Sequence, residues 1–264
     1  MVVAQEGTRA ATWRCGGPRL QQIRNGALLA SMSRTNEDWV QAIEAHVAQV
    51  NKLTSEPIAS SILLPDSNFA QFIDHTLLKS NATPSQIDQL CNEAIQYKFK
   101  VVLIVSIHDS ASVPCAVVGF PLGASKSCIK ASETKEAIQD GAQEIDMVIN
   151  IGALQSGNYS LVYEDIQEVV AAASGVLVKV ILETIFLTDA EKIAACFLAA
   201  EAGAAFVKTS TGFCGGGATV EDVSLMRRSV AYKAGSVKVK ASAGIRSFDK
   251  CMDMIRAGAD RLGT

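Results

Sequence analysis

The chain has 264 residues, of which 48% are hydrophobic and 19% charged, so it can bury a large core and is not disordered over most of its length. Its apolar residues occur in short runs of Val, Ile, Leu and Ala, and none reaches the roughly 18–20 residues of a membrane span. The net charge is −3, and the body of the chain has no basic surface typical of nucleic-acid binding. We therefore expect a soluble protein with buried strands, and neither a membrane nor a nucleic acid as its partner.

Cysteine and histidine usage argues against stabilisation by disulfides or metals. The seven cysteines are an odd number, are scattered along the chain and form no CxxC pair, and there are only three histidines. We expect neither a disulfide framework nor a His-rich or Cys-rich metal site. A reducing compartment fits this pattern best.

The first 35 residues differ in charge from the rest of the chain. They carry five arginines and a single acid, Glu6, which gives this segment a charge of +4 and the remainder −7. An Arg-rich, Ser-containing and acid-poor segment is typical of an organelle transit peptide, although Gly16, Gly17 and Pro18 interrupt any helix there. Residues 1–35 are therefore interpreted as a disordered leader or a transit peptide, and the location as cytoplasmic or, with a transit peptide, organellar.

The first predicted element is a helix over residues 37–52. Trp39, Ile43 and Val47 recur every four residues along it, and Asn36 is the expected N-cap.

His46 lies in this helix without an evident partner, so we interpret it as an ordinary helical residue. Residues 53–70 contain Ser and Pro breaks and are predicted to be a linker. Residues 36–70 thus form an N-terminal helical extension.

From residue 72 onward, a short apolar strand followed by an amphipathic helix recurs along the chain. Capping boxes at Thr83–Gln86 and Thr188–Glu191 mark two of the helix starts. Eight strands are predicted, over residues 72–76, 100–106, 114–120, 144–149, 177–183, 206–211, 237–242 and 259–264. Eight strands with crossover helices are typical of a (β/α)8, or TIM, barrel.

The predicted barrel is shorter than usual. A (β/α)8 barrel typically takes about 250 residues, and a crossover that includes a helix needs at least about 10–12. Only seven residues separate Ser106 from Pro114, and the eighth strand reaches Thr264. We therefore expect residues 71–264 to form a C-terminally truncated barrel with six crossover helices, lacking helix 2 and the final helix.

Charged side chains interrupt several of the apolar strands: Asp74, Asp146, Lys179, Lys208 and Lys240. A single lysine in such a strand is usually an end residue whose stem packs while its amine reaches water. Lysines in three successive strands must instead share a polar centre with the carboxylates, because an unpaired buried ammonium is costly. We expect the lysines to lower one another's pKa, so that one amine becomes a nucleophile able to form a Schiff base with a carbonyl.

Glycines cluster after the sixth and seventh strands and in the eighth, at Gly212, Gly215–Gly217, Gly244 and Gly263. Loops after strands 7 and 8 of such barrels often present backbone N–H groups to a phosphate, although a flexible connection would show the same composition. His75 and His108 have no partners at catalytic or metal-binding spacing and are interpreted as structural.

Five motifs together resemble deoxyribose-phosphate aldolases of the bacterial-like branch, in order over residues 72–264. They are IDHTLL at 73–78, VGFPLG at 118–123, EIDMVIN at 144–150, VKTSTG at 207–212 and KASAGIR at 240–246. The resemblance implies a class I aldolase without metal or cofactor. Such an enzyme reversibly cleaves 2-deoxy-D-ribose 5-phosphate to D-glyceraldehyde 3-phosphate and acetaldehyde, in deoxyribonucleotide catabolism.

The resemblance also implies roles for single residues. Lys208 corresponds to the Schiff-base lysine, Asp146 to the acid that relays protons, and Lys240 to the second lysine that tunes the nucleophile. The expected substrate-binding residues are Asp74, Thr76, Lys179, Thr209, Gly212, Gly244 and Gly263. The expected partners are a small phosphosugar and, optionally, further copies of the chain.

Three departures from the family pattern keep other functions open. The second strand lacks the usual Cys-Val-Asn-Pro-like end, Ala243 precedes Gly244 where the family usually has Gly-Gly, and the phosphate-binding serines expected beyond Gly263 are missing. An inactive or misfolding truncated variant is therefore the alternative interpretation. A phosphosugar isomerase on the same fold is a third.

Overall fold

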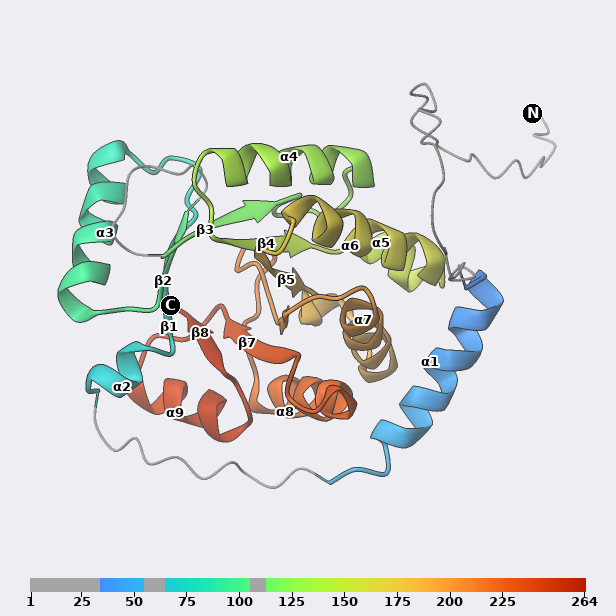
Figure 1. Ribbon diagram of the computed structural model, residues 1–264. Coiled ribbons are helices and arrows are strands. Elements are labelled where there is room, and N and C mark those ends of the chain that lie inside the picture. Colours follow the sequence, from blue (N-terminus) through green and yellow to red (C-terminus); the bar gives the residue numbers. More distant parts are fainter. Residues whose placement is uncertain (1–33, 55–64, 105–112) are drawn as a thin grey trace, which may run out of the picture. The chain divides into compact units, whose positions relative to one another are not determined.

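The computed structural model describes residues 34–54, 65–104 and 113–264 (Figure 1). Within these residues, eight parallel strands pair in chain order and close into a barrel, because β8 pairs with both β7 and β1. The strands are β1 (Ile73–Leu77), β2 (Val101–Ile104), β3 (Val113–Val118), β4 (Glu144–Val148), β5 (Leu177–Ile181), β6 (Phe206–Lys208), β7 (Lys238–Ser242) and β8 (Arg261–Gly263). The predicted (β/α)8 barrel is confirmed.

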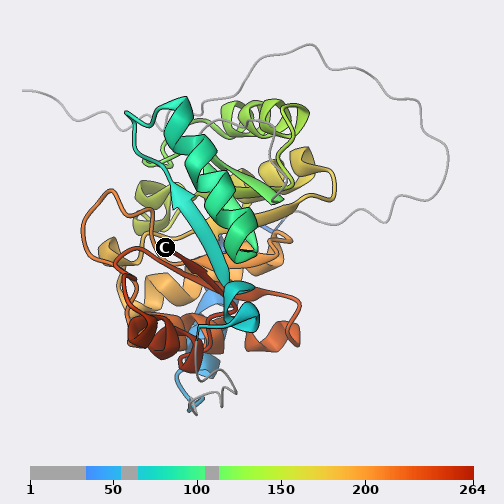
Figure 2. The same cartoon turned by 90° about the vertical axis from the view of Figure 1, so that its left-hand side faces the viewer.

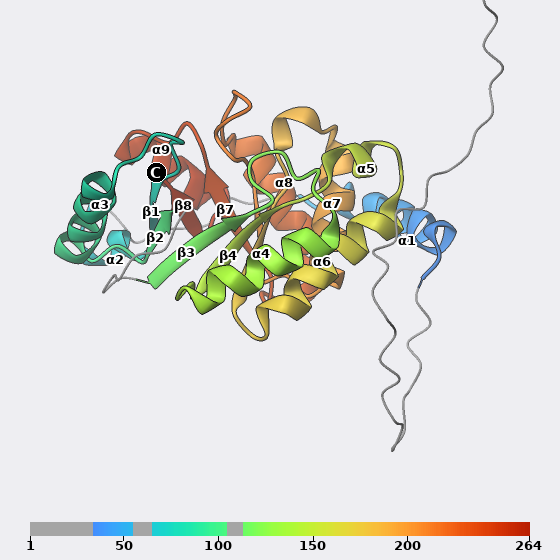
Figure 3. The same cartoon turned by 90° about the horizontal axis from the view of Figure 1, so that it is seen from above.

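Helices fill six of the crossovers between the described strands, and two further helices precede β1. The helices are α1 (Asn36–Val50), α2 (Ser67–Ala70), α3 (Pro84–Tyr97), α4 (Ser127–Gln139), α5 (Ile151–Gln155), α6 (Tyr159–Ala173), α7 (Asp189–Glu201), α8 (Val220–Val230) and α9 (Phe248–Arg256), with 3-10 turns η1 (Thr184–Phe186) and η2 (Ala231–Lys233). Figure 2 shows α3 along the outside of β1, and Figure 3 shows α4 beside α6. The predicted capping boxes hold: Gln86 accepts from the Thr83 N–H, and Glu191 from the Thr188 N–H.

The connection from β2 to β3 includes residues 105–112, which lie outside the described part of the chain. The predicted absence of helix 2 and the truncation after strand 8 therefore stay predictions. Each of the other six connections between successive strands contains a helix, as expected. Several predicted strands were too long: β6, for example, ends at Lys208 instead of residue 211.

The apolar core lies between the strands and the surrounding helices. Along β4, Ile145 and Met147 belong to this core, whereas Glu144 and Asp146 take the alternate positions that point into the barrel. On the β2–β3 side the interior is apolar, with Leu103 as an example. The barrel centre is thus polar on one side and apolar on the other.

Helix α1 begins one residue earlier than predicted, and Asn36 is not its N-cap. Thr35 is the N-cap: its hydroxyl accepts from the Asp38 N–H, and the Asp38 carboxylate accepts from the Thr35 N–H. The Asn36 amide instead donates to the Gly157 carbonyl and accepts from the Ser160 N–H. The Asn36 side chain thus binds residues more than 100 positions away, and the preceding Thr35 caps the helix.

The interpretation of His46 as an ordinary helical residue is wrong. Its ring is buried, stacks on Phe197 at 4.6 Å between centroids, and lies 2.8 Å from the Ser229 carbonyl oxygen. Trp39 and Ile43 on the same helix join the main core. Helix α1 is therefore packed against the barrel.

The predicted linker contains a short helix, α2, whose N-cap Asp66 accepts from the Asn68 and Phe69 N–H groups. Residues 55–64 and 1–33 lie outside the described residues. The leader or transit peptide, and the cytoplasmic or organellar location linked to it, therefore stay predictions.

Candidate active site

The charged residues singled out in the strands meet inside the barrel. Asp146 is the centre of the cluster: it accepts from the amines of Lys179 and Lys208 at 2.7 Å each and of Lys240 at 3.0 Å. The thiol of Cys115 on β3 lies 3.2 Å from the same carboxylate. All of these side chains are buried. Strand alternation and parallel pairing place them there, since Asp146 is paired with Lys179 and Lys208 with Lys240.

A second layer of charges lies next to this carboxylate. Lys240 contacts Asp74 at 2.6 Å and Lys179 contacts Glu144 at 2.6 Å. Arg261 on β8 connects the two carboxylates, with distances of 3.0 Å to Asp74 and 2.8 Å to Glu144. Glu144 and Arg261 were not among the predicted site residues, although each lies two residues before an interior position and the strand period of two could have indicated them.

The predicted lowering of one lysine's pKa by another holds at Lys208, but it is outweighed at Lys179 and Lys240. Burial lowers the pKa of Lys208 to about 8, with help from the nearby charge of Lys240 and against the effect of Asp146. Burial acts in the same direction on Lys179 and Lys240, but the surrounding carboxylates outweigh it and raise their pKa. Only Lys208 is therefore close to neutrality.

The Asp146 carboxylate and the Cys115 thiol have fixed protonation states at neutral pH. Burial opposes ionisation of Asp146, but the ammonium groups of Lys179, Lys208 and Lys240 hold its pKa well below the usual range. Burial raises the pKa of Cys115, so it remains a thiol. At pH 7 the cluster consequently offers one amine with an appreciable uncharged fraction, that of Lys208.

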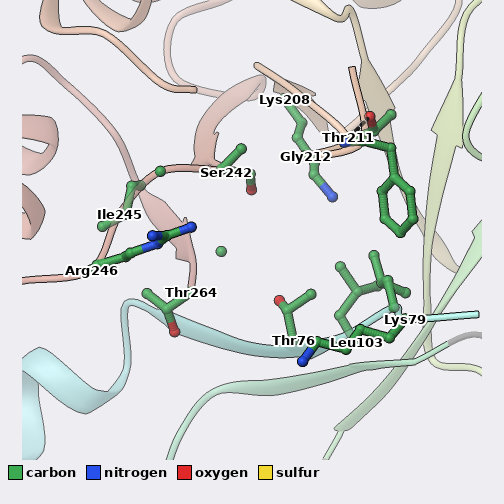
Figure 4. Close-up of a pocket in the computed structure, with 15 residues that line it drawn as sticks. Thr76, Lys79, Leu103, Lys208, Thr211, Gly212, Ser242, Ile245, Arg246 and Thr264 are labelled. Carbon is green, nitrogen blue, oxygen red and sulfur yellow. Dashed lines mark hydrogen bonds between the residues drawn. The ribbon is translucent and has the colours of Figure 1, made fainter. Parts of the chain in front are cut away.

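A cavity of about 330 Å³ opens above the cluster, at the carboxyl ends of the strands. Figure 4 shows Lys208 pointing into it, with Ser242, Thr76 and Leu103 around the same space. Of the predicted site residues, those that line this cavity are Thr76, Lys208, Gly212, Gly244 and Gly263. Its position matches that of active sites in (β/α)8 barrels.

The other predicted site residues do not line the cavity. Asp74, Asp146, Lys179 and Lys240 belong to the buried charge cluster. The Thr209 hydroxyl bridges β6 and β7, because it donates to the Ser242 carbonyl and accepts from the Ser242 N–H, both at 2.9 Å.

Glycines let two backbone segments approach each other at the cavity. A Cβ on Gly217 would lie 2.9 Å from the Ala243 carbonyl oxygen, and a Cβ on Gly263 would lie 2.3 Å from the Ser242 hydroxyl oxygen, so that this side chain would have to move. Ala243 and Gly244 both have positive φ, a conformation in which successive N–H groups can converge on an anion.

Two cationic residues at the cavity, Lys79 and Arg246, were not among the predicted site residues. Figure 4 shows Arg246 reaching toward the same space as Lys208. Both residues lie in loops, where hydrophobic periodicity does not indicate which side chains reach a site.

The Glu183 carboxylate holds the loop after β6 through hydrogen bonds to Thr211. This buried carboxylate accepts from the N–H and the hydroxyl of Thr211, and the Thr211 hydroxyl accepts from the Phe213 N–H at 3.1 Å. The Gly212 N–H between them has no partner in the described part of the chain. It is therefore available to a ligand in the cavity.

The described ranges contain no cluster of three or more His, Cys, Asp or Glu side chains suited to a metal ion. His75 contacts Glu93 of α3 at 2.7 Å, and His108 lies outside these ranges. None of the helices described is long and apolar enough to cross a membrane.

Curated relatives share most of the chain. It is 55% identical over 215 residues to a deoxyribose-phosphate aldolase of Carboxydothermus hydrogenoformans, covering 76% of this chain and 93% of that one. It is 53% identical over 205 residues to the enzyme of the same name from Staphylococcus epidermidis, covering 74% and 92%.

Solved structures show the same architecture. A candidate deoxyribose-phosphate aldolase from Coccidioides immitis is 41% identical with a TM-score of 0.82, covering 88% of this chain and 94% of that one. The deoxyribose phosphate aldolase of Aeropyrum pernix, described as tetrameric, is 31% identical with a TM-score of 0.69, covering 85% and 93%. The family model of DeoC/LacD family aldolases matches residues 69–263. The chain belongs to this aldolase family.

Proposed function

We propose that this chain is a class I aldolase that reversibly cleaves 2-deoxy-D-ribose 5-phosphate to D-glyceraldehyde 3-phosphate and acetaldehyde. The observation that carries the proposal is the Lys208 amine, which lines the cavity and has a pKa lowered to about 8. A near-neutral amine is the group that Schiff-base chemistry requires, and it has no evident use in an isomerase. The names of the relatives support the choice of substrate.

Lys208 acts as the nucleophile. Roughly a tenth of an amine with this pKa is uncharged at pH 7, and its lone pair attacks the C1 aldehyde of the substrate. Loss of water from the resulting carbinolamine leaves a protonated imine. Asp146, 2.7 Å from the Lys208 amine, balances this positive charge and receives protons released beside it.

The imine then withdraws the electrons that break the carbon–carbon bond. A base takes the proton of the C3 hydroxyl, the C3–O electrons form the carbonyl of D-glyceraldehyde 3-phosphate, and the C2–C3 electrons move to the imine to give an enamine. Protonation of the enamine at C2 and attack of water on the new imine release acetaldehyde and restore the amine. The protonated Lys179 and Lys240 favour the ionised form of Asp146, so a proton that it accepts is passed on in the next step.

The phosphate is held at the opposite end of the cavity from the amine. The Arg246 guanidinium supplies charge, and the N–H groups of Gly212 and Gly244 supply donors. Gly263 and Thr76 line the same cavity, where they contact the sugar. Asp74, Lys179 and Lys240 act on the substrate only through the charge cluster.

The alternative of an inactive or misfolding truncated variant is not favoured, because the barrel closes around a complete charge cluster. A homo-oligomer is part of the proposal, since the Aeropyrum pernix relative is described as tetrameric. Light scattering coupled to size-exclusion chromatography measures the mass of the assembly.

Borohydride reduction tests the proposed reaction. Incubation with 2-deoxyribose 5-phosphate followed by reduction is expected to add a stable adduct to Lys208, identified by peptide mass spectrometry. Lys208→Ala is expected to lack the adduct and to lose at least about a thousand-fold in cleavage rate.

Lys192→Ala is the matched control. Lys192 on α7 does not line the cavity and forms ion pairs with Asp189 and Asp222, so its loss is expected to leave both the adduct and the rate unchanged. Folded wild-type protein without a substrate-dependent adduct on Lys208 would overturn the proposal.

A further inference from the structure

Six charged side chains inside the barrel form a closed ring of alternating sign. In order around the ring they are Asp146, Lys179, Glu144, Arg261, Asp74 and Lys240. Each neighbouring pair is joined by an N···O distance between 2.6 and 3.0 Å. Three carboxylates and three cations make the ring neutral when all are ionised.

Lys208 is attached to this ring from outside, through Asp146 alone among the described residues. Its protonated form is therefore a seventh charge that the ring does not balance. In the ring, Asp74 and Asp146 are held acidic and Lys179 and Lys240 are held basic, whereas Lys208 titrates near pH 8. When one charge of the ring is removed, Lys208 is consequently the group whose protonation state changes first.

Arg261 and Glu144 close the ring at the end away from the cavity. Neither lines the cavity, and both are buried. The guanidinium also lies over the ring of Phe206, 5.6 Å from its centroid. Without this pair, Asp74 and Lys179 would each lose one of their two ion-pair partners.

We propose that Arg261 and Glu144 are positioning residues of the aldolase centre, which complete a neutral ring and thereby keep Lys208 available as an uncharged nucleophile. The inference deepens the proposed function and rests on it for the role of the amine. The two residues act through Asp74, Lys179 and Asp146 and do not touch the substrate.

Removing the positive charge of Arg261 and removing the negative charge of Glu144 are expected to shift the titration midpoint of Lys208 in opposite directions. Arg261→Gln leaves the ring with one excess negative charge, which favours protonated Lys208 and raises its titration midpoint by about one pH unit. Glu144→Gln leaves one excess positive charge and lowers the midpoint by a similar amount. Arg261→Lys retains the charge and is expected to restore the wild-type midpoint.

The test measures Lys208 directly. The full-length protein is labelled with acetic anhydride, a small uncharged amine reagent, at a series of pH values, and the Lys208 peptide is quantified by mass spectrometry. Besides the two altered residues, the charged or titratable groups near Lys208 are Asp146, Lys240 and Cys115, then Lys179 and Asp74 through the ion pairs of the ring, and Lys79 and Arg246 at the cavity. None of these is altered in the variants.

A kinetic measurement separates positioning from structural damage. Arg261→Gln is expected to reduce kcat at pH 7 about ten-fold, to leave KM nearly unchanged because the cavity walls are intact, and to regain activity as the pH rises. The double variant Glu144→Gln/Arg261→Gln removes one charge of each sign and is expected to return the midpoint to that of the wild type. If Arg261→Gln does not fold, Glu144→Gln and the double variant carry the test.

Asp165→Asn is the matched control. Asp165 forms a buried ion pair with Lys130 at 2.6 Å outside the ring, so this isosteric substitution removes a buried charge without changing the ring. Its Lys208 midpoint is expected to equal that of the wild type. Midpoints of Glu144→Gln and Arg261→Gln that coincide with the wild type, or that move in the same direction, would overturn the inference.

Failure of the inference is distinct from failure of the proposed function. A borohydride adduct on wild-type Lys208 with unshifted variants refutes only the role of the ring. A wild type without the adduct refutes the proposed function, whatever the labelling midpoints are.

Discussion

At the scale of single residues, Arg246 is the cavity side chain that we propose to recognise the phosphate. We expect Arg246→Gln to raise KM for 2-deoxyribose 5-phosphate by about 10–100-fold, because a charge-assisted hydrogen bond to the phosphate is lost. For unphosphorylated 2-deoxyribose, KM should stay the same. Steady-state kinetics on the two sugars give the comparison, with Arg256→Gln, an exposed arginine of α9 paired with Asp253, as the control. An equal rise in KM for both sugars would show that Arg246 does not bind the phosphate.

At the scale of elements, α1 is attached to the barrel by Trp39. This indole is 3% exposed and contacts the rings of Tyr163 on α6 and Phe197 on α7, with the Arg34 guanidinium 4.6 Å from its centre. Trp39→Ala is expected to lower the free energy of unfolding by about 3–5 kcal/mol, through lost burial and the cavity that remains. Urea unfolding of the purified protein measures this change.

The control at the same scale is Leu53, which follows α1 and is 42% exposed. Leu53→Ala should change the free energy of unfolding by no more than about 0.5 kcal/mol. Similar losses in the two variants would mean that α1 contributes no specific packing to the barrel.

At the scale of the whole molecule, His46 makes stability depend on pH. Burial lowers its pKa in the folded state, while the Ser229 carbonyl and Glu201 act in the opposite direction. The unfolded chain therefore binds the proton first as the pH falls below about 6.5, so that folding stability decreases there. We expect the midpoint of urea unfolding to fall more steeply between pH 7 and pH 5 in the wild type than in His46→Gln, which retains a hydrogen-bond donor. Parallel curves for the two proteins would contradict this role.

The barrel and half of the site could be predicted from local patterns. Apolar strands separated by amphipathic helices are visible in the chain because burial on one face imposes a period, and the capping boxes at Thr83 and Thr188 mark where two of the helices begin. Lys208, Lys240 and Asp146 stand out because a charge in an apolar strand is costly unless it is paired. The same pairing argument, applied two residues upstream, would have led to Glu144.

Other features depend on partners far away in the sequence. Asn36 resembles an N-cap but hydrogen-bonds to Gly157, 121 positions on, and His46 finds its acceptor 183 positions on. Arg246 lies in the loop after β7 and lines the cavity, a placement that cannot be predicted from hydrophobic periodicity.

The sequence by itself determined the fold class, the strand positions and the identity of the charged residues, because hydrophobic periodicity and the cost of buried charge act locally along the chain. Only the tertiary structure decided which lysine is near neutral. Lys179 and Lys240 each lie between two carboxylates, whereas Lys208 has one, so their pKa values move in opposite directions. That difference arises in part from the closure of the barrel, which brings Asp74 on β1 to the amine of Lys240 on β7.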